Sequence, residues 1–395
     1  MANRNSDVIV IGGGASGLVA AIAAGQHGVD VTIVEKNMRV GKKILTTGNG
    51  RCNLSNTIIG KPEGMAQYNH PAFVQPVLSR FDCASIRLFF YELGLLTVAD
   101  KNGWVFPRSR TANTVLDVLT KEIDRLPITT YTGQEIVNIR LTDEGYRVET
   151  SGSSFASKTL VLACGVVPLL KSFSTLAVVR PEPVLGPLRT DVDSLRGLDG
   201  IRTVCRIYLA DSREMVSYED GELLFRDFGV SGIAIFNLSR FAQPGQSLYI
   251  DFFPDLDQEE LEAQLLYRFE KNNDLSASDL LCGMLHSKII QAVLRKSKIK
   301  PNDSLDPELL KQLGSNLKRF RLIISASTLS DQAQATRGGL VTETIDPDTL
   351  GMLEHRGLFA AGESIDIDGP CGGFNLHWAW ASGLVAGESA AFAVL

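Results

Sequence analysis

The sequence predicts an α/β fold in which one parallel-sheet domain is interrupted by inserted segments. The first observation is an apolar strand at residues 8–11 that runs into glycines, a small-residue helix and a second apolar strand at residues 31–34. The second is another strand, glycine loop and helix at residues 358–383. The third is a change, from about residue 195, to alternating strands and then to helices. Strand–helix units at both ends of a chain are typical of one domain that continues after an insertion.

The first strand–helix junction contains a glycine pattern suited to a dinucleotide. Gly12 permits a tight turn, Gly14 lets the backbone approach a pyrophosphate, and Gly17 lets the helix pack closely against the strand. The N–H groups and the dipole at the start of that helix favour phosphate charges. Glu35 ends the second strand, eighteen residues after Gly17, where a carboxylate can accept hydrogen bonds from both ribose hydroxyls. The pattern therefore predicts a Rossmann-like clamp for the adenosine half of a dinucleotide.

A polar, glycine-rich loop follows the clamp. Gly48 and Gly50 allow the backbone to pass close to a ring or a phosphate. Arg51 can neutralise an anion, and Asn53 can bond to the amide edge of a ring. Cys52 is the candidate catalytic side chain, because a thiol near a reacting ring could donate a proton. The alternative is that Cys52 is a small packing residue, since only Arg51 nearby would lower its pKa.

The rest of the first domain is predicted from short periodic segments. Helices are expected at residues 72–93 and 111–125, and a strand pair at residues 134–139 and 146–150. A further buried parallel strand is expected at residues 159–164, ending at Gly165. The first part of the dinucleotide-binding domain is therefore expected to cover residues 1–194.

Two inserted segments are expected before the chain returns to the first domain. Alternating strands are predicted at residues 203–209, 222–226 and 247–253, and helices at residues 257–272, 277–298 and 307–317. The predicted divisions are a β-rich domain at residues 195–255 and 318–336, a helical insertion at residues 256–317, and the second part of the dinucleotide-binding domain at residues 337–395.

The C-terminal junction indicates how long the bound dinucleotide is. A strand at residues 358–361 ends at Gly362, and a loop with glycines at 369, 372 and 373 opens into an alanine-rich helix from about Asn375. A cofactor held at both junctions has to be long, and FAD fits because its flavin ring can lie against the last helix. The positive end of that helix would stabilise charge at N1 and O2 of the reduced flavin. NAD alone would not need the second junction; the alternative is that these glycines only start a packed helix.

Composition limits the class of protein. The 395 residues are 44% hydrophobic and 21% charged, which is typical of globular domains with sizeable cores. No apolar run approaches the ~20 residues needed to cross a bilayer, and no leader opens the chain, so a cytoplasmic protein that does not span a membrane is expected. The six cysteines include no C-x-x-C and no cysteine–histidine cluster, so neither a metal site nor a disulfide framework is predicted.

One segment is basic in a chain whose net charge is -6. Between residues 286 and 321 there are nine basic residues and three acidic ones, an asymmetry expected of an RNA-docking surface on the helical insertion. The alternative is a solvated charged face. The nine basic residues are Lys288, Arg295, Lys296, Lys298, Lys300, Lys311, Lys318, Arg319 and Arg321.

These motifs resemble those of a family of bacterial FAD-dependent oxidoreductases, described as aminoacetone-oxidase-like or bile-acid-inducible flavoproteins, which includes a ribosomal RNA dihydrouridine synthase. The matching motifs span nearly the whole chain, from residues 12–17 to residues 361–383. The resemblance implies a glutathione-reductase-like FAD domain with an inserted β-domain and a small helical domain. It also implies cofactor contacts at Gly12, Gly14, Ala15, Ser16, Gly17, Glu35, Lys36, Lys43, Gly50, Arg51, Cys52, Asn53, the backbone of Val137, Gly165, Gly362, Glu363, Gly373, Phe374, Asn375 and Leu376.

Two positions depart from the pattern of that family. Gly165 is followed by Val-Val-Pro-Leu-Leu, where family members usually have a longer glycine-rich segment, so the wall near the flavin is expected to be remodelled. His377 stands where the family usually has glutamine. A histidine there could donate a proton, or it could pack and bond locally.

The expected function is that of an FAD-dependent oxidoreductase, which moves hydride through flavin N5 to or from a double bond of a small molecule or a nucleobase. One alternative is a ribosomal RNA dihydrouridine synthase that reduces uracil C5–C6, which the basic segment favours. Another is a non-catalytic flavin-binding sensor or scaffold. NADH or NADPH is a candidate reductant, although the chain has no second G-x-G-x-x-G.

Overall fold

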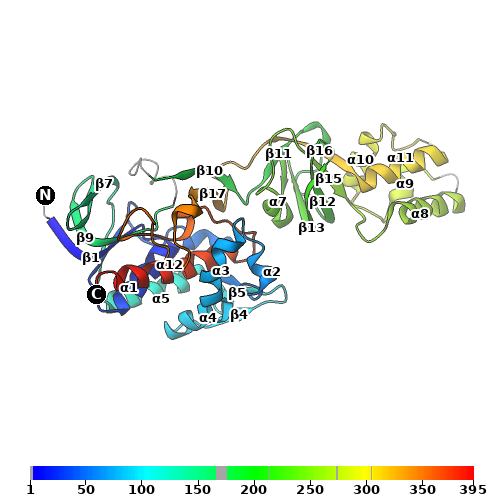
Figure 1. Ribbon diagram of the computed structural model, residues 1–395. Coiled ribbons are helices and arrows are strands. Elements are labelled where there is room, and N and C mark those ends of the chain that lie inside the picture. The colour runs from blue at the N-terminus through cyan, green and yellow to red at the C-terminus, as the bar shows by residue number, and fades with distance from the viewer. Residues whose placement is uncertain (1–2, 166–175, 213, 273–274, 304) are drawn as a thin grey trace. The chain divides into compact units, whose positions relative to one another are not determined.

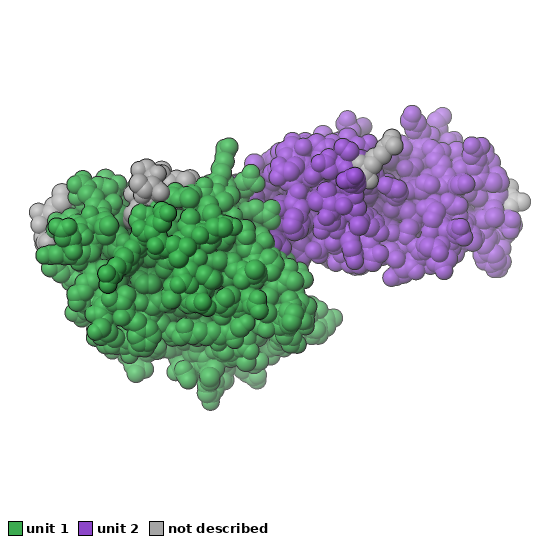
Figure 2. Space-filling view, in the orientation of Figure 1, with its two compact units in different colours: residues 1–182, 335–395 green, residues 183–334 purple. Residues whose placement is uncertain are grey.

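The computed structural model of the protein describes residues 3–165, 176–212, 214–272, 275–303 and 305–395. The chain forms two compact units, which Figure 2 shows in different colours. Unit 1 comprises residues 1–182 and 335–395, and unit 2 comprises residues 183–334. The segment after Gly165, which is expected to differ from the family pattern, begins with residues 166–175, which lie outside the described residues.

A mostly parallel sheet forms the centre of unit 1. Its strand order is β6-β2-β1-β9-β8-β7, and β18 also pairs with β9. The carboxyl ends of the parallel strands meet at one edge, where ligands bind in sheets of this kind. The α/β class and the strands expected in this unit are confirmed. The parallel strands are β1 (Asn3–Ile11), β2 (Val31–Val34), β6 (Ile128–Tyr131), β9 (Ser154–Leu162) and β18 (Leu358–Ala360), and the antiparallel pair is β7 (Ile136–Thr142) with β8 (Gly145–Thr150).

Two helices of small residues pack against each other and against the sheet (Figure 1). They are α1 (Ala15–Gln26), which follows β1, and α12 (Phe374–Phe392), which ends the chain. A Cβ on Gly383 would lie 2.6 Å from the carbonyl oxygen of Ser16, and a Cβ on Gly387 would lie 2.2 Å from that of Ala20. Two glycines spaced by one helical turn therefore let the backbones of α1 and α12 approach closely. This contact packs an N-terminal helix against the C-terminal one.

The other elements of unit 1 surround this sheet. The helix expected at residues 72–93 is two helices, because Asp82 caps a new one by accepting a hydrogen bond from the N–H of Ser85 at 2.8 Å. A small sheet has the order β3-β5-β4, and β10 pairs with β17. The elements are α2 (Pro62–Met65), α3 (Pro71–Arg80), α4 (Cys83–Glu92), α5 (Ala112–Arg125), β3 (Ser55–Asn56), β4 (Thr97–Ala99), β5 (Trp104–Pro107), β10 (Val178–Val184) and β17 (Ala335–Leu340).

A closed antiparallel barrel forms part of unit 2, with the order β11-β14-β13-β12-β15-β16. Alternate side chains fill it, because Cys205, Ile207 and Leu209 on β12 are buried whereas Val204 is 72% exposed. The strands are β11 (Leu188–Thr190), β12 (Arg202–Asp211), β13 (Glu214–Arg226), β14 (Gly229–Ser231), β15 (Ser247–Asp251) and β16 (Phe320–Ala326), and α7 (Ile233–Leu238) follows β14.

The first barrel strand corrects the expected domain boundary. The sequence prediction places residues 183–194 in the dinucleotide-binding domain, but β11 pairs with β14 and β16 and belongs to unit 2. Three residues are too few to show a periodic pattern, and the strand is defined only by partners that are distant in the sequence.

In the described part of unit 2, four helices follow β15 and share one apolar core with the barrel. Each begins at a side chain that accepts a hydrogen bond from a backbone N–H, and Asp257 with Glu260 forms a complete capping box. The helices are α8 (Gln258–Lys271), α9 (Ala277–Leu281), α10 (Ser287–Lys296) and α11 (Pro307–Lys318). No helix in the described part of the chain is long and apolar enough to cross a membrane.

Candidate functional site

The turn between β1 and α1 is crowded on one side and open on the other. A Cβ on Gly12 would lie 2.5 Å from the carbonyl oxygen of Ala163, and a Cβ on Gly17 would lie 1.8 Å from that of Gly12. Among the described residues, a Cβ on Gly14 meets no atom within 4 Å, and no side chain caps the helix there. The first N–H groups of α1 have no partner within the helix, so an anion in this space would complete their hydrogen bonds.

Glu35 lies beside this turn and bonds first to the protein backbone. It is 6% exposed, and its carboxylate accepts the N–H of Gly13 at 2.7 Å and that of Asn37 at 2.8 Å. The sequence predicts ribose hydroxyls as its partners. Oε1 also accepts the side-chain amide of Asn37, at 2.5 Å, so both of its lone pairs are used. Among the described residues Oε2 accepts only the N–H of Gly13, so it keeps a lone pair for one hydroxyl of a ligand.

Cationic side chains surround an open hollow next to Glu35. The hollow has a volume of about 540 Å³ and is lined by Lys36, Asn37, Met38, Arg39 and Lys42. Three cations around one hollow favour an anionic group. Lys36 therefore lies with two further cations that the sequence did not single out.

Val137 lies where β7 departs from regular pairing. The register slips between Ile136 and Asn138, which leaves Val137 as an extra residue on its strand. Its side chain is 62% exposed. The N–H of Gln134 donates to the carbonyl oxygen of Glu35 at 2.9 Å, which ties the start of this strand to the turn. The bulge leaves Val137 without a partner residue on β8, so its backbone groups lie outside the regular ladder.

Cys52 is inside the core of unit 1 and not at an open surface. It is 0% exposed, and burial raises the pKa of its thiol to about 12. The prediction that Cys52 donates a proton to a bound ring is therefore wrong, because a thiol without exposed surface cannot touch a ligand. Asn53 is also buried, whereas Arg51 is exposed and its guanidinium lies 5.5 Å from the centre of the Phe106 ring. Of these three neighbours, only Arg51 has its side chain available to a ligand.

We expect a thiol reagent to leave Cys52 unmodified in the folded protein, because modification would require the core to open and the thiol to ionise. Exposed Cys282 is the matched control, and it should react at least about 100-fold faster than Cys52. Peptide mapping by mass spectrometry after timed labelling measures both rates. Labelling of Cys52 as fast as that of Cys282 would contradict the buried position.

The glycine loop before α12 is held by contacts within the chain. Gly373 has a φ of 98°, and a Cβ there would lie 2.4 Å from the carbonyl oxygen of Ser55. The amide of Asn375 closes the loop by accepting the N–H of Gly369 at 3.0 Å and donating to its carbonyl oxygen at 2.8 Å. Phe374 is 3% exposed and Leu376 is half-buried. This segment therefore offers a ligand mainly backbone and the helix N-terminus.

Two further predicted glycines bring the C-terminal half of unit 1 to the first turn. Gly165, after the end of β9, donates its N–H to Oγ of Ser364 at 3.1 Å. A Cβ on Gly362 would lie 2.5 Å from Oγ of Ser16. Segments that are far apart in the sequence thus meet at the carboxyl edge of the parallel sheet.

An ion pair also joins an early and a late segment. Nζ of Lys43 lies 2.5 Å from Oε2 of Glu363, and the two side chains are 57% and 28% exposed. At this exposure the pair stabilises the fold by at most about 1 kcal/mol. The structure therefore brings together two residues that the resemblance implies as cofactor contacts, and both keep exposed surface.

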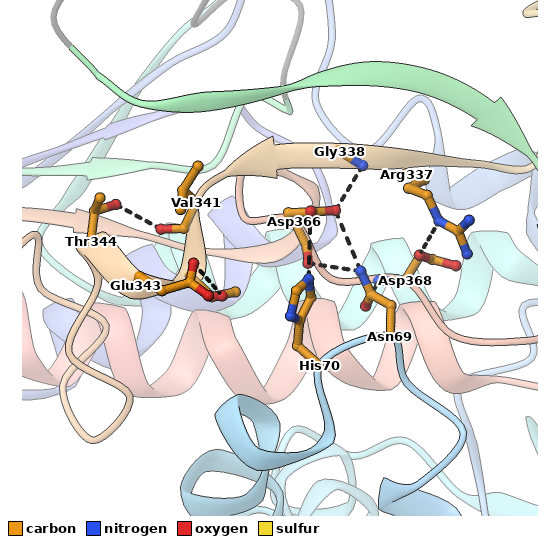
Figure 3. A network of polar contacts seen from close by, with 10 residues as sticks. Asn69, His70, Arg337, Gly338, Val341, Glu343, Thr344, Asp366 and Asp368 are labelled. Carbon is orange, nitrogen blue, oxygen red and sulfur yellow. Dashed lines mark hydrogen bonds and ion pairs between the residues drawn. The ribbon is translucent and has the colours of Figure 1, made fainter.

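A polar network that the sequence did not predict precedes the glycine loop (Figure 3). Asp366 accepts a backbone N–H from β17 at 2.9 Å and lies 3.5 Å from Nε2 of His70. Asp368, which is 0% exposed, lies 3.0 Å from Nε of Arg337. The side-chain amide of Asn69 bonds to the backbone of both aspartates: it donates to the carbonyl oxygen of Asp366 and accepts the N–H of Asp368. The sequence did contain a signal for this network: after a buried strand, two aspartates alternate with isoleucines. Aspartates in such an apolar setting are expected to be buried, and a buried carboxylate requires hydrogen-bond or ion-pair partners.

His377 is a neutral, fully bonded core residue. It is 0% exposed, its Nδ1 lies 2.8 Å from Oγ of Ser55, and its Nε2 lies 2.9 Å from the carbonyl oxygen of Phe81. Because that carbonyl can only accept, Nε2 carries the proton and Nδ1 accepts from the serine hydroxyl. Burial lowers the pKa of His377 to about 4. The structure thus matches local packing and bonding rather than proton donation.

We expect His377 to make stability depend on pH below neutrality. Its folded-state pKa of about 4 lies below the ordinary value of 6.5, so protons bind the unfolded state first. The stabilisation is present above pH 6.5 and is lost as the pH falls towards about 4, by up to ~3 kcal/mol. His377→Gln can keep both hydrogen bonds and should flatten this part of the profile. Urea unfolding at several pH values measures the difference, and identical profiles for both proteins would contradict it.

The basic segment at residues 286–321 is not one free surface. Lys318 is 14% exposed in an ion pair at 2.7 Å. Arg295 donates to the turn at residues 194–196 at 2.6 Å, and Lys296 donates to the same turn at 2.9 Å. The last two cations are at the barrel rather than on the helices: Arg319 and Arg321.

Comparison with known proteins agrees with this architecture. The chain matches the family described as HI0933-like protein Rossmann domain over residues 6–389. It is 33% identical to the 3-dehydro-bile acid delta(4,6)-reductase of Clostridium scindens, over 97% of this chain and 98% of the relative. It is 26% identical to the ribosomal RNA dihydrouridine synthase of Escherichia coli, over 95% of this chain and 96% of the relative.

A solved structure supports the fold. The 3-ketosteroid delta1-dehydrogenase from Sterolibacterium denitrificans has a TM-score of 0.50 and 12% identity, with 98% of this chain and all of that chain covered. The resemblance inferred from the motifs is confirmed by the family match and by the 33% identity over nearly the whole chain. The chain belongs to the HI0933-like family of Rossmann-domain proteins.

Proposed function

We propose that the protein is an FAD-dependent oxidoreductase that reduces a carbon–carbon double bond conjugated with a carbonyl group. The observation that carries the proposal is the meeting, at one sheet edge, of the open turn at Gly14, the end of β9 at Gly165 and the segment at Gly362. A dinucleotide bound along this edge would run from the bulge at Val137 to the start of α12.

The residues at this edge fit FAD. The space before Gly14 and the uncapped N–H groups of α1 suit a pyrophosphate. Glu35 would accept from a ribose, and the backbone of Val137 would bond to the adenine. The N-terminus of α12, which begins after Gly373 without a side-chain cap, would favour negative charge on the ring. When bound, FAD supplies a hydride donor and acceptor at N5.

The names of the relatives support an activated double bond as the substrate group. In a 3-dehydro bile acid with Δ4,6 double bonds, the alkenes are conjugated with the C3 carbonyl, and the uridine C5–C6 bond is conjugated with the C4 carbonyl. In both, addition of hydride places negative charge on the carbonyl oxygen, which cations and N–H groups stabilise. The higher identity, 33% against 26%, favours a small molecule.

Reduction of uridine in ribosomal RNA is the second candidate. The exposed cations Arg319 and Arg321 at the barrel favour it, because phosphate contacts need unburied positive charge. The relatives are named as enzymes, which disfavours the alternative of a flavin-binding sensor or scaffold.

We propose NADH or NADPH as the reductant. We also propose a reducing, cytoplasmic location, which the six free cysteines support.

Anaerobic flavin spectroscopy tests the proposal. The purified protein should release FAD on heating, NADH or NADPH should bleach the bound flavin, and a 3-oxo-Δ4 steroid should restore its colour as the alkene is reduced. A colourless protein without FAD would overturn the proposal. Reoxidation by a uridine-containing ribosomal RNA fragment alone would favour the second candidate, and reoxidation by neither would favour the sensor.

A further inference from the structure

A row of tyrosines crosses the outer face of the barrel. Tyr208 on β12 pairs with Tyr218 on β13 and with Tyr249 on β15, and Tyr249 pairs with Arg321 on β16. The four side chains therefore lie in register across four neighbouring strands. Neighbours along the strands, such as Ile207, are buried in the barrel, so the pleat directs the row outward.

The rings of this row have accessible surface. Tyr218 is 51% exposed, and Tyr208 and Tyr249 are half-buried. The ring centres of Tyr208 and Tyr218 are 6.1 Å apart, and the planes are tilted by 40°. The guanidinium of Arg319 lies 4.9 Å from the centre of the Tyr249 ring. The face thus combines aromatic rings with a guanidinium that is already placed over one of them.

Positive charge is concentrated at one end of the row. At the other end, Arg206 is neutralised by Asp220 through two hydrogen bonds of 2.6 and 2.8 Å. Within the described parts of the chain, neither Arg319 nor Arg321 forms an ion pair, and both are exposed. Nε of Arg321 donates to Oγ of Ser247 at 3.0 Å, which leaves its terminal nitrogens for an anion.

We propose that this tyrosine row (Tyr208, Tyr218, Tyr249, Arg319 and Arg321) binds single-stranded RNA. Unpaired bases stack on aromatic side chains that a sheet surface presents, while arginines bind the phosphates. Exposed Val204 and Ile323 lie on the same face, but the arginines at the end of the row, which form no ion pair among the described residues, favour an anionic partner over an apolar protein face. The inference deepens the second candidate of the proposed function, because it assigns RNA to a particular surface of the barrel. Binding at the barrel requires no chemistry in unit 1, so the two can be tested separately.

Fluorescence anisotropy with a labelled oligouridylate and the full-length holoprotein tests this surface. We expect Tyr218→Ala and Tyr208→Ala each to weaken binding about tenfold. Replacing Arg319 and Arg321 by glutamine should lower the slope of log affinity against log salt by about 1.4. Tyr267→Ala is the matched control, because Tyr267 is a 59% exposed tyrosine on α8 with Lys271 5.1 Å from its ring, and it should bind like the wild type.

Flavin content and steroid reduction in the same variants keep this inference separate from the proposed function, since both should stay unchanged. Absence of binding at low salt, or equal losses in the Tyr267 control, would overturn the inference. Equal affinity for a fully paired RNA would also overturn it, because paired bases cannot stack on the row. A dimer in size-exclusion chromatography that Tyr218→Ala dissociates would assign the face to a second copy of the chain instead.

Discussion

Gly14→Val is expected to abolish FAD binding while the protein remains folded. The backbone at Gly14 is extended, with φ of -84° and ψ of -166°, which any residue adopts. A Cβ there meets no described atom within 4 Å, so the side chain would occupy the space that we assign to the pyrophosphate. Loss of two charge-assisted hydrogen bonds from the first turn of α1 corresponds to at least ~100-fold weaker binding.

Isothermal titration of the apoprotein with FAD measures the loss, and thermal unfolding of the apoprotein measures the fold. The control is Gly221→Ala in unit 2, whose Cβ would lie 3.5 Å from that of Ala234, an ordinary van der Waals distance. It should bind FAD normally. Normal affinity in Gly14→Val would show that the pyrophosphate lies elsewhere, whereas unfolding of that apoprotein would contradict the open space before Gly14.

Gly387→Val, unlike Gly14→Val, is expected to destabilise the fold itself. A Cβ on Gly387 would lie 2.2 Å from the carbonyl oxygen of Ala20, and this neighbour is backbone, so it cannot move aside as a side chain could. Helices α1 and α12 would have to move apart where their backbones are in contact. We expect the free energy of unfolding to fall by about 3 kcal/mol or more.

Urea unfolding of the two variants and the wild type measures this difference. Ser389→Val is the control on the same helix, at a half-buried position, and should change the free energy of unfolding by less than about 1 kcal/mol. Equal effects of both substitutions would contradict the close approach of α1 and α12. A stable Gly387→Val protein would do the same.

Local patterns in the sequence predicted much of unit 1 and the main elements of unit 2. The glycines at 12, 14 and 17 and the apolar strands around them define a turn within a few residues, so the pattern and the structure coincide. The long helices were recognisable for the same reason, because their caps and apolar periods are contained in the helix itself. The strand β11 was not, since only pairing with β14 and β16 makes it a strand.

The roles of single side chains depended on contacts that no local pattern records. For Cys52 and His377 the sequence left a proton donor and a packed residue as alternatives, and the structure buries both. The partners of His377, Ser55 and Phe81, are distant from it in the sequence. The hydrogen-bond partners of Asp366 and Asp368 lie on β17 and at Asn69, which no local pattern in the sequence identifies.

The α/β class, the dinucleotide clamp and the second strand–helix junction follow from the order of residues alone, because hydrophobic period and glycine spacing act over short stretches of chain. Three other features required the folded chain: the two junctions share one sheet edge, Cys52 is sealed in the core, and three tyrosines align across the barrel. The physical reason is that burial and strand register are set by partners remote in the sequence, whose positions are fixed only when the whole chain packs.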